Sequence, residues 1–347
     1  MYRGHTIGVI VPAYNEESHV GGVLETMPEF VDRIYAVDDR STDDTWEIIR
    51  EYAAASRRST DEERVDSAAD ERPAPYASLP DGGTIEGTEI VAIRHEENQG
   101  AGGALRTGYV RARDDGMDVV VTIDADGQMD PDQLPKLLDP IVEGEADYAK
   151  GNRLADRESR REMPPFRLFG NWLLTQLTKI ASGYWTLQDP QNGYTAITNE
   201  ALSAVDIESL PDDHEYPNDL LVRLNVAGMR VADVSMPAKY ADEESTIDYK
   251  RFIPITSVTL LHGFLRRMRV RLADDRGDPA ALGYLIGVAS LAGAVAFAVA
   301  AGVNAIQDET PLRELFTTGL AFAASAVVFL VAMGIDAAAN AGKGVRR

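Results

Sequence analysis

Residues 119–130 read VVVTIDADGQMD, and this segment carries the clearest structural signal in the chain. Its first five residues are apolar or β-branched, which is the pattern of a buried strand. Asp124 and Asp126 follow where the strand ends, and side chains two residues apart on an extended chain project to the same side. Two anionic oxygen ligands at the carboxyl end of a strand suit Mg²⁺ or Mn²⁺ bridging a substrate's phosphates. The simpler alternative is that both aspartates only shape the turn before Gly127.

The segments before this strand repeat one pattern, in which a strand is followed by a polar turn and a helix. Strands are expected over residues 5–12, 33–38 and 89–94, and helices from residue 18 onward and over 45–55. The second helix follows a turn rich in helix-capping side chains. This alternation predicts an α/β fold with a mostly parallel, Rossmann-like sheet.

The same pattern continues beyond the two aspartates. We expect a helix over 132–143, a strand over 147–150, a helix over 219–227 and a last strand over 230–240. Between them, residues 166–184 form an apolar amphipathic segment with basic ends. Such a segment suits either the protein core or a bilayer surface.

Two stretches depart from this regular pattern. Residues 56–87 are polar, charged and rich in Pro and Gly, which predicts a flexible acidic surface insertion rather than a domain boundary. Residues 98–105 form a glycine-rich start to a helix. No GK[ST] sequence follows, so a P-loop is excluded, and we expect the glycines to permit tight packing of that helix on the sheet.

Residues 251–279 form a basic amphipathic segment. Its apolar side chains give way to four arginines, Arg266, Arg267, Arg269 and Arg271. An apolar face that runs into a basic cluster predicts a helix lying at an anionic membrane surface.

Two long uncharged runs follow, at residues 280–306 and 315–335. Each exceeds the roughly 20 residues that a transmembrane helix needs. The connector is acidic and the outer flanks are basic, so the positive-inside rule places both flanks in the cytoplasm. No secretory signal opens the chain, which agrees with a cytoplasmic N-terminus. We therefore expect two spans in the cytoplasmic membrane, with the catalytic domain and the C-terminus cytoplasmic. The alternative is a buried helical hairpin of a soluble protein.

The composition excludes some functions. The 347 residues carry a formal net charge of -22, so no basic face is available and a nucleic-acid partner is not expected. The chain has no cysteine, which excludes disulfides and thiolate metal sites. Its acid-rich, lysine-poor surface is typical of a cytoplasm at high salt, as in a halophile, because screening weakens self-repulsion. The five histidines are scattered and suggest no cluster.

Five motifs occur in one order along the chain. They are VPAYNE at 11–16, VDDRSTD at 37–43, DADGQ at 124–128, GNR at 151–153 and DPQNGY at 189–194. Together they resemble the family 2 glycosyltransferases with the GT-A fold, above all the dolichyl- or polyprenyl-phosphate sugar synthases such as dolichyl-phosphate mannosyltransferase. The likeness covers roughly residues 6–249, with membrane helices appended as in several members. Each motif alone is weak, but all five in order are a strong signal.

The resemblance implies a GT-A catalytic domain over residues 1–250 and a nucleotide-sugar donor. The donor-binding residues that it implies are Pro12, Tyr14, Glu16, Val37, Asp39, Asp124, Ala125, Asp126, Gln128 and Arg153. The implied ligands of Mg²⁺ or Mn²⁺ are Asp124, Asp126 and Gln128. These roles suit the side chains, because Asp39 can accept from a ribose hydroxyl or a base N–H and Tyr14 can pack on a ring. For each residue the alternative is a purely structural role in a turn or at a helix start.

The resemblance also implies residues on the acceptor side. Arg153 corresponds to an arginine near phosphate, with a surface ion pair as the alternative, and Asp189 corresponds to an aspartate at the acceptor. Both are the implied catalytic residues. Ser245, Lys250 and Arg251 are the implied acceptor-binding residues.

The chain departs from the family pattern at two positions. Arg40 occupies a position where the family commonly has glycine. Ala101 occupies a position where a lysine or arginine often follows the Asn-x-Gly sequence. The missing cation leaves the donor phosphates to the metal, Arg106 or Arg153, so these departures leave the nucleotide and the sugar open.

The expected reaction is transfer of a hexose, with inversion, from a GDP- or UDP-linked sugar to dolichyl or polyprenyl phosphate at the cytoplasmic membrane face, for protein glycosylation. A phosphate acceptor is already ionised, so catalysis needs positioning and metal stabilisation of the leaving group rather than a strong base. One alternative is a transferase that elongates a lipid-linked saccharide, with Asp189 as the base. Another is a non-catalytic membrane scaffold or lipid carrier.

Overall fold

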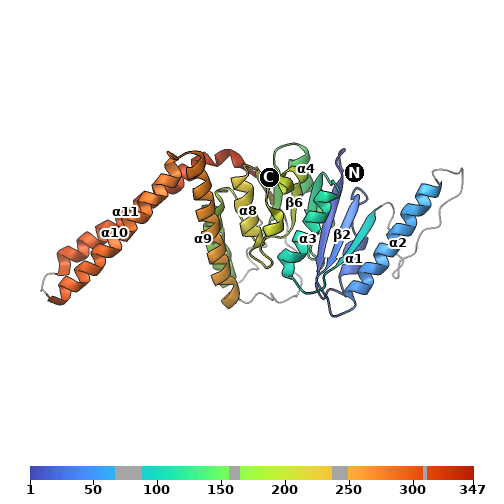
Figure 1. Cartoon of the computed structure of the whole chain (residues 1–347), viewed down its shortest axis with the longest axis horizontal. Helices are drawn as coiled ribbons and strands as arrows, with labels where there is room; N and C mark the ends of the chain where they lie inside the picture. The colour runs from blue at the N-terminus through green and yellow to red at the C-terminus, as the bar shows by residue number, and fades with distance from the viewer. Residues whose placement is uncertain (67–87, 156–164, 237–248, 308–310) are drawn as a thin grey trace.

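The computed structural model describes residues 1–66, 88–155, 165–236, 249–307 and 311–347. A layered domain of sheet and helices occupies one end of the molecule. Two long helices project together from the other end (Figure 1).

The described part contains one sheet of eight strands in the order β3-β2-β1-β4-β6-β5-β7-β8. The strands are β1 (Ile7–Ala13), β2 (Arg33–Asp38), β3 (Glu89–Arg94), β4 (Val119–Thr122), β5 (Tyr148–Asn152), β6 (Thr195–Thr198), β7 (Val231–Ser235) and β8 (Gly344–Arg346). Neighbouring strands are parallel, except that β6 runs antiparallel to both β4 and β5. The predicted mostly parallel α/β sheet is confirmed.

The described residues form helices that either cover the sheet or extend beyond it. They are α1 (Val20–Glu25), α2 (Thr45–Asp66), α3 (Gly100–Asp114), α4 (Leu134–Val142), α6 (Pro165–Ser182), α7 (Asn199–Ala204), α8 (Tyr216–Val226), α9 (Tyr249–Asp274), α10 (Pro279–Gln307) and α11 (Pro311–Ala339). Helices α1, α2 and α4 pack on one face, and α3, α7 and α8 pack on the other.

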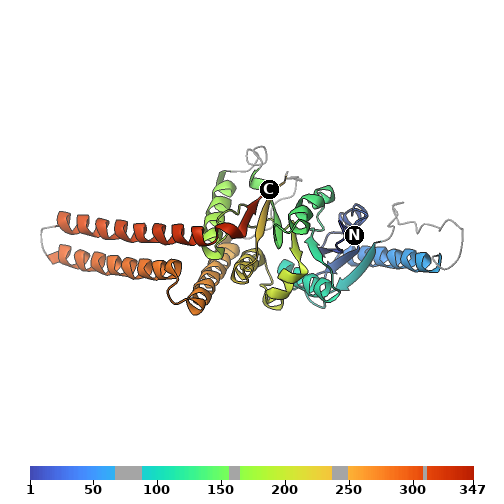
Figure 2. The same cartoon turned by 90° about the horizontal axis from the view of Figure 1, so that it is seen from above.

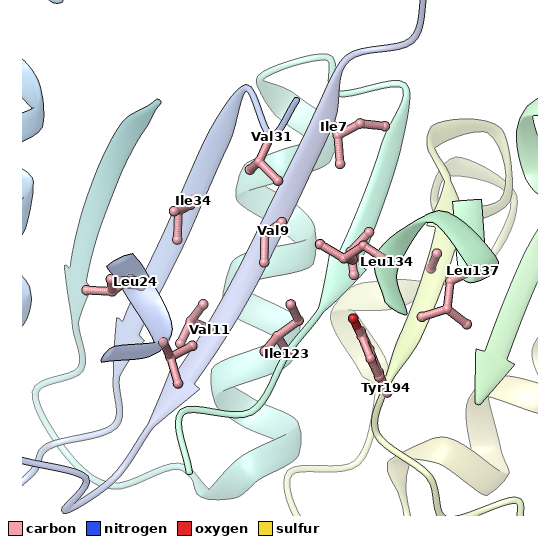
Figure 3. Close-up of a cluster of buried hydrophobic side chains, with 14 of the residues drawn as sticks. Ile7, Val9, Val11, Leu24, Val31, Ile34, Ile123, Leu134, Leu137 and Tyr194 are labelled. Atoms are coloured by element: carbon pink, nitrogen blue, oxygen red, sulfur yellow. The ribbon is translucent and has the colours of Figure 1, made fainter. Parts of the chain in front are cut away.

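The core forms because side chains of successive strand residues point to opposite faces. In β1, Ile7, Val9 and Val11 join the cluster under α1, α2 and α4 (Figure 3), whereas Ile10 joins the cluster under α3. All four are fully buried. A strand that is buried on both faces reads as a continuous apolar run, and this is why the sequence located it.

Helix α2 is longer than the sequence indicated. The prediction ended this helix at residue 55 and began the flexible insertion at residue 56, but α2 continues to Asp66. Residues 56–66 contain neither Pro nor Gly, so a helix already anchored by packing extends into them at low cost. The rest of the predicted insertion, residues 67–87, lies outside the described part of the chain.

Helices α10 and α11 form an antiparallel hairpin whose arms lie side by side (Figure 2). Residues Pro279–Val303 and Arg313–Ala339 are long and apolar enough to cross a membrane, and only 11% of the most apolar window in each is buried. A buried hairpin of a soluble protein would be covered by other elements, so that alternative does not describe these helices. After the hairpin the chain returns to the domain, where β8 pairs with β7. The sequence had predicted residues 230–240 as the last strand.

The basic cluster of α9 is only partly available to a membrane. Arg267 is 1% exposed and donates hydrogen bonds through Nη1 and Nη2 to the Asp336 carboxylate of α11, at 2.8 and 2.7 Å. Arg271 donates to the same carboxylate at 2.8 Å. The expectation that these two arginines face an anionic leaflet is therefore wrong, because a buried carboxylate on the returning helix requires cationic partners.

The close packing of α3 on β1 leads to a stability prediction. A Cβ added at Gly108 would overlap the Ile10 side chain. We expect Gly108→Ala to lower the free energy of unfolding by about 1–3 kcal/mol, because overpacking outweighs the better helix propensity of alanine. The matched control is Gly22→Ala in α1, where an added Cβ meets no atom within 4 Å and a small gain is expected. Thermal unfolding of the detergent-solubilised protein measures both, and an unchanged midpoint for Gly108→Ala would contradict the packing argument.

Candidate active site

The turns that follow β1, β2 and β4 meet at one edge of the sheet, because these strands are parallel neighbours. They enclose a pocket of about 650 Å³. The predicted donor residues that line it are Pro12, Tyr14, Glu16, Asp39, Asp124, Ala125 and Asp126. Gln191 and Gly193 of the DPQNGY motif also line it, so the fold gathers four of the sequence motifs around one cavity.

Asp124 and Asp126 both reach this pocket. Burial and the neighbouring charge of Asp126 raise the pKa of Asp124 to about 7. Two carboxylates that face each other without a cation show this behaviour, so the pair fits a divalent metal. The described residues contain no group of three or more His, Cys, Asp or Glu that could hold a metal ion. The chain would thus supply two carboxylates, and phosphate and water oxygens would complete the shell.

This pKa leads to a prediction for metal affinity. Asp124 is protonated below pH 7 and ionised above it, and a metal ion must displace the proton. We expect the affinity for Mn²⁺, titrated without nucleotide, to fall by about tenfold between pH 8 and pH 6. Electron paramagnetic resonance of free Mn²⁺ measures it, and Asp124→Asn should remove most of the pH dependence. Equal affinity of the wild type at both pH values would contradict the assignment.

Asp39 lines the pocket, but its carboxylate is already engaged. Oδ1 accepts from the backbone N–H of Gln99 at 2.8 Å and contacts His95 Nδ1 at 2.6 Å, and Oδ2 accepts from the N–H of Gly100 at 2.8 Å. The other ring nitrogen of His95 contacts Thr107 Oγ1 at 2.8 Å. Asp39 therefore holds the start of α3 in place, and Oδ2 retains capacity for one further donor such as a ribose hydroxyl.

Three predicted donor residues, Val37, Gln128 and Arg153, lie outside the lining of this pocket. The Val37 side chain is fully buried in the core, where it packs with the α3 cluster. The backbone N–H of Gln128 donates to Asp126 Oδ1 at 2.9 Å, which shapes the turn after β4. A side-chain contact from Val37 to the donor would require the core to open, so the structure does not support that role. The assignment of Gln128 as a metal ligand stays a prediction.

The segment after α7 completes the pocket, although none of the five sequence motifs includes it. The residues of this segment that line the pocket include Asp212, Asp213, His214 and Tyr216. The glycine-rich start of α3 packs against this segment rather than against the sheet, since a Cβ at Gly102 would overlap the Pro211 carbonyl oxygen. The glycines were the available sequence signal. They indicate that another segment approaches this backbone closely, but they do not identify that segment.

Charge pairing decides which arginines remain available. Arg106 donates to Asp212 Oδ1 and to the Leu210 carbonyl, so it stabilises the segment that lines the pocket.

Arg40 adopts a φ of +65° and is exposed. This left-handed backbone explains why glycine suits that position, since other residues pay about 1–2 kcal/mol there.

Arg153 and Asp189 form a tight pair beside the pocket. Arg153 Nε and Nη2 donate to the two carboxylate oxygens of Asp189 at 2.8 and 3.1 Å, and the Arg153 backbone N–H donates at 3.1 Å. Burial alone would raise the pKa of Asp189, but the charge and hydrogen bonds of Arg153, with the charge of Lys150, hold the pKa below its usual value. Asp189 is thus a well-satisfied carboxylate and a poor base.

An apolar groove of about 580 Å³ lies beside this pair. It is lined by Leu154, Leu168, Phe169, Trp172, Thr175, Gln176, Lys179 and Gln188. Leu154 and Gln188 adjoin Arg153 and Asp189 in the chain, so the groove leads from the exposed apolar side chains of α6 toward the ion pair. The apolar segment predicted over residues 166–184 therefore presents Phe169 and Trp172 outward, and both are more than half exposed.

The predicted acceptor residues cannot be placed at this site. Ser245 lies outside the described residues. Lys250 and Arg251 belong to the first turn of α9, and their side chains lie outside the described part. Their roles stay predictions.

The comparisons with known proteins agree with this site. The model of glycosyl transferase family 2 matches residues 8–65 and 65–205, and the chain belongs to this family. It is therefore a glycosyltransferase. The described sheet and helices agree with the GT-A architecture that the sequence predicted.

The names of several relatives include a lipid phosphate. UDP-N-acetylglucosamine–dolichyl-phosphate N-acetylglucosaminyltransferase of Methanococcus voltae is 28% identical over 237 residues, which is 68% of this chain and 86% of the relative. Undecaprenyl-phosphate mannosyltransferase of Micrococcus luteus is 26% identical, over 68% of this chain and 83% of the relative. Polyprenol monophosphomannose synthase of Mycolicibacterium smegmatis is 27% identical, over 68% and 77%.

Solved structures give a more distant likeness. Glucosyl-3-phosphoglycerate synthase of Mycobacterium tuberculosis, in complex with Mn²⁺, UDP and glucosyl-3-phosphoglycerate, is 19% identical to this chain. The alignment covers 76% of this chain and 80% of that one, with a TM-score of 0.48.

Proposed function

We propose that this glycosyltransferase transfers a hexose from a nucleotide sugar to dolichyl or another polyprenyl phosphate. The observation that carries the proposal is the saturated Arg153–Asp189 pair between the acidic pocket and the apolar groove. The pocket suits an anionic donor held through a divalent metal, and the groove suits a lipid chain. The names of the three relatives agree with such an acceptor.

The ion pair favours a phosphate over a hydroxyl acceptor. A hydroxyl must lose its proton as it attacks, which calls for a general base of suitable pKa. Asp189 accepts three hydrogen bonds from Arg153 and its pKa is lowered, so it fills that role poorly. A phosphate is already anionic, and the partly exposed guanidinium of Arg153 is a suitable partner for it. Elongation of a lipid-linked saccharide is therefore the second candidate reaction.

The chain's own residues would act mainly by positioning. Glu16, Asp39 and Tyr14 surround the space for the nucleoside, while Asp124 and Asp126 would hold Mg²⁺ or Mn²⁺. A bound metal ion of this kind neutralises the charge that develops on a leaving diphosphate. The attacking oxygen and the leaving diphosphate would lie on opposite sides of the anomeric carbon, which inverts it.

The hairpin supports a membrane-bound enzyme whose two termini share one side. β8 follows α11 and pairs with β7 of the catalytic sheet, so both ends of the hairpin meet the same domain (Figure 2). This arrangement and the charged flanks support the proposal of two spans and a cytoplasmic catalytic face. Protein glycosylation is the proposed destination of the sugar.

The test is an assay of membranes that contain the full chain, with dolichyl phosphate, Mn²⁺ or Mg²⁺ and a panel of labelled UDP- and GDP-sugars. One labelled sugar in a monoglycosyl lipid that mild acid cleaves would support the proposal and identify the donor. Label that appears only when a lipid-linked saccharide is supplied would favour the elongating transferase. No transfer with either acceptor, and no donor binding, would favour a non-catalytic scaffold.

A further inference from the structure

Lys150 is a buried lysine directly beneath the Arg153–Asp189 pair. It lies on β5 and is 1% exposed. Its Nζ donates hydrogen bonds to three backbone carbonyls, those of Gly151 at 3.0 Å, Gln188 at 2.9 Å and Asp189 at 2.6 Å. An ammonium group has three N–H donors, so all of them are used on backbone, and two of them on the segment that carries Asp189.

The counter-charge of Lys150 comes from the neighbouring strand. Asp233 of β7 is the register partner of Lys150, and its Oδ1 lies 3.6 Å from Nζ. The same carboxylate accepts from Asn152 Nδ2 at 2.6 Å and from the Gln188 backbone N–H at 3.3 Å. A buried ion pair adds little net stability compared with apolar residues of the same volume, so stability alone does not account for it.

The segment that Lys150 holds has a backbone that needs support. Asp189 adopts a φ of +47°, in the left-handed region that disfavours residues other than glycine. Such a conformation costs about 1–2 kcal/mol and persists where the surroundings determine it. The two carbonyl bonds from Lys150 constrain the peptide groups on either side of this residue. The carboxylate of Asp189 in turn sets the position of the Arg153 guanidinium.

We propose that Lys150 is a positioning residue for sugar transfer: by its bonds to the Gln188 and Asp189 carbonyls it sets the Asp189 turn, and through Asp189 it aims Arg153 at the acceptor. Asp233 serves as the counter-charge that lets the ammonium be buried. This inference rests on the proposed function, because it assigns Arg153 to the acceptor side. Lys150 does not line the donor pocket, so its effect should spare nucleotide binding.

The test compares four variants of the full chain: Lys150→Met, Asp233→Asn, the double variant and Lys136→Met. Lys136 is an exposed lysine on α4 and serves as the matched control. Thermal unfolding, UDP binding with Mn²⁺, and kcat and KM for dolichyl phosphate are measured for each. Amide hydrogen exchange over residues 186–192 provides a readout that does not depend on activity.

Each single variant should unfold at a lower temperature, because it leaves one buried charge without its partner. The double variant should recover much of that stability, because both charges are gone. The kcat values of the variants should not change in parallel with their stabilities. We expect kcat to fall about 100-fold in Lys150→Met and to stay low in the double variant, since small misplacement of an orienting group costs that much. Asp233→Asn should stay within a few-fold of the wild type, because the carbonyl bonds of Lys150 remain.

Recovery of kcat together with stability in the double variant would overturn the proposal and leave Lys150 a structural residue. Equal loss of kcat in Asp233→Asn and Lys150→Met would overturn it as well. If Lys150→Met alone fails to fold, the double variant decides, because it leaves no buried charge unpaired and still lacks the carbonyl bonds. A kcat of the double variant near that of the wild type would then overturn the proposal. If wild type and Lys136→Met transfer no sugar, the proposed function has failed. Hydrogen exchange then decides whether Lys150 sets the turn, and unchanged protection over 186–192 in Lys150→Met would show that it does not.

Discussion

Replacing Asp126 with alanine should lower the rate of sugar transfer by about 10³-fold, because it removes one of two carboxylates proposed to hold the metal on the leaving diphosphate. Asp126 lines the donor pocket at the end of β4, and its charge helps to raise the pKa of Asp124. Without Asp126 the pKa of Asp124 falls, but Asp124 is left as the single one of these two carboxylates for the cation. We expect weaker Mn²⁺ binding together with the loss of rate.

The side chain at 126 also shapes the turn, so a second variant separates the two roles. Asp126→Asn keeps a group that can accept the hydrogen bond from the Gln128 N–H but removes the charge. We expect it to fold like the wild type and to lose nearly as much activity as Asp126→Ala. Asp114→Ala, at an exposed aspartate on α3, is the matched control and should leave transfer unchanged. Activity of Asp126→Asn within about tenfold of the wild type would contradict a charge-based role.

Arg153→Met should lower kcat/KM for dolichyl phosphate by about 10²–10³-fold while UDP binding changes little. The Arg153 side chain is 36% exposed beside the groove, so it can reach an acceptor while it stays hydrogen-bonded to Asp189. Lysine at this position cannot form the bidentate contact with Asp189, so Arg153→Lys should restore only a small part of the rate. Steady-state kinetics with varied dolichyl phosphate and calorimetry with UDP and Mn²⁺ measure the two effects.

The control for this experiment is Arg111→Met, which removes an exposed arginine from α3. A second comparison is Asp189→Asn, which retains one acceptor oxygen for Arg153 but lacks the bidentate partner. We expect an intermediate loss, since Arg153 keeps its charge and loses part of its alignment. A loss of UDP affinity in Arg153→Met as large as the loss in kcat/KM would place Arg153 at the donor instead of the acceptor.

The sequence located most of the sheet because buried parallel strands are short apolar runs ended by polar turns. Strands β2 and β3 occupy the predicted ranges, and β1 and β4 differ by a few residues at their ends. Strand β6, which runs against its neighbours, was not predicted. It has only four residues, two of them threonine, and nothing local states its direction. The direction of strand β6 depends on the position at which the preceding turn ends.

The sequence likewise located the acidic pair and the turns around the donor pocket, because each motif is a few contiguous residues at a strand end. It did not find the wall formed by residues 211–217 or the buried lysine at 150. A lysine inside a strand gives no sign of its partners. Two of those partners are carbonyls 38 and 39 residues away.

The sequence by itself determined the α/β class, the family, the strand-end carboxylates and the two long apolar helices. These depend on local composition and spacing, which the chain carries wherever it folds. The tertiary structure alone decided which charged side chains are paired. Arg267 pairs with Asp336 instead of facing lipid, and Asp189 pairs with Arg153 instead of serving as a general base. The physical reason is that an ion pair or a shifted pKa depends on distances and burial among residues far apart in the chain, and only folding sets these.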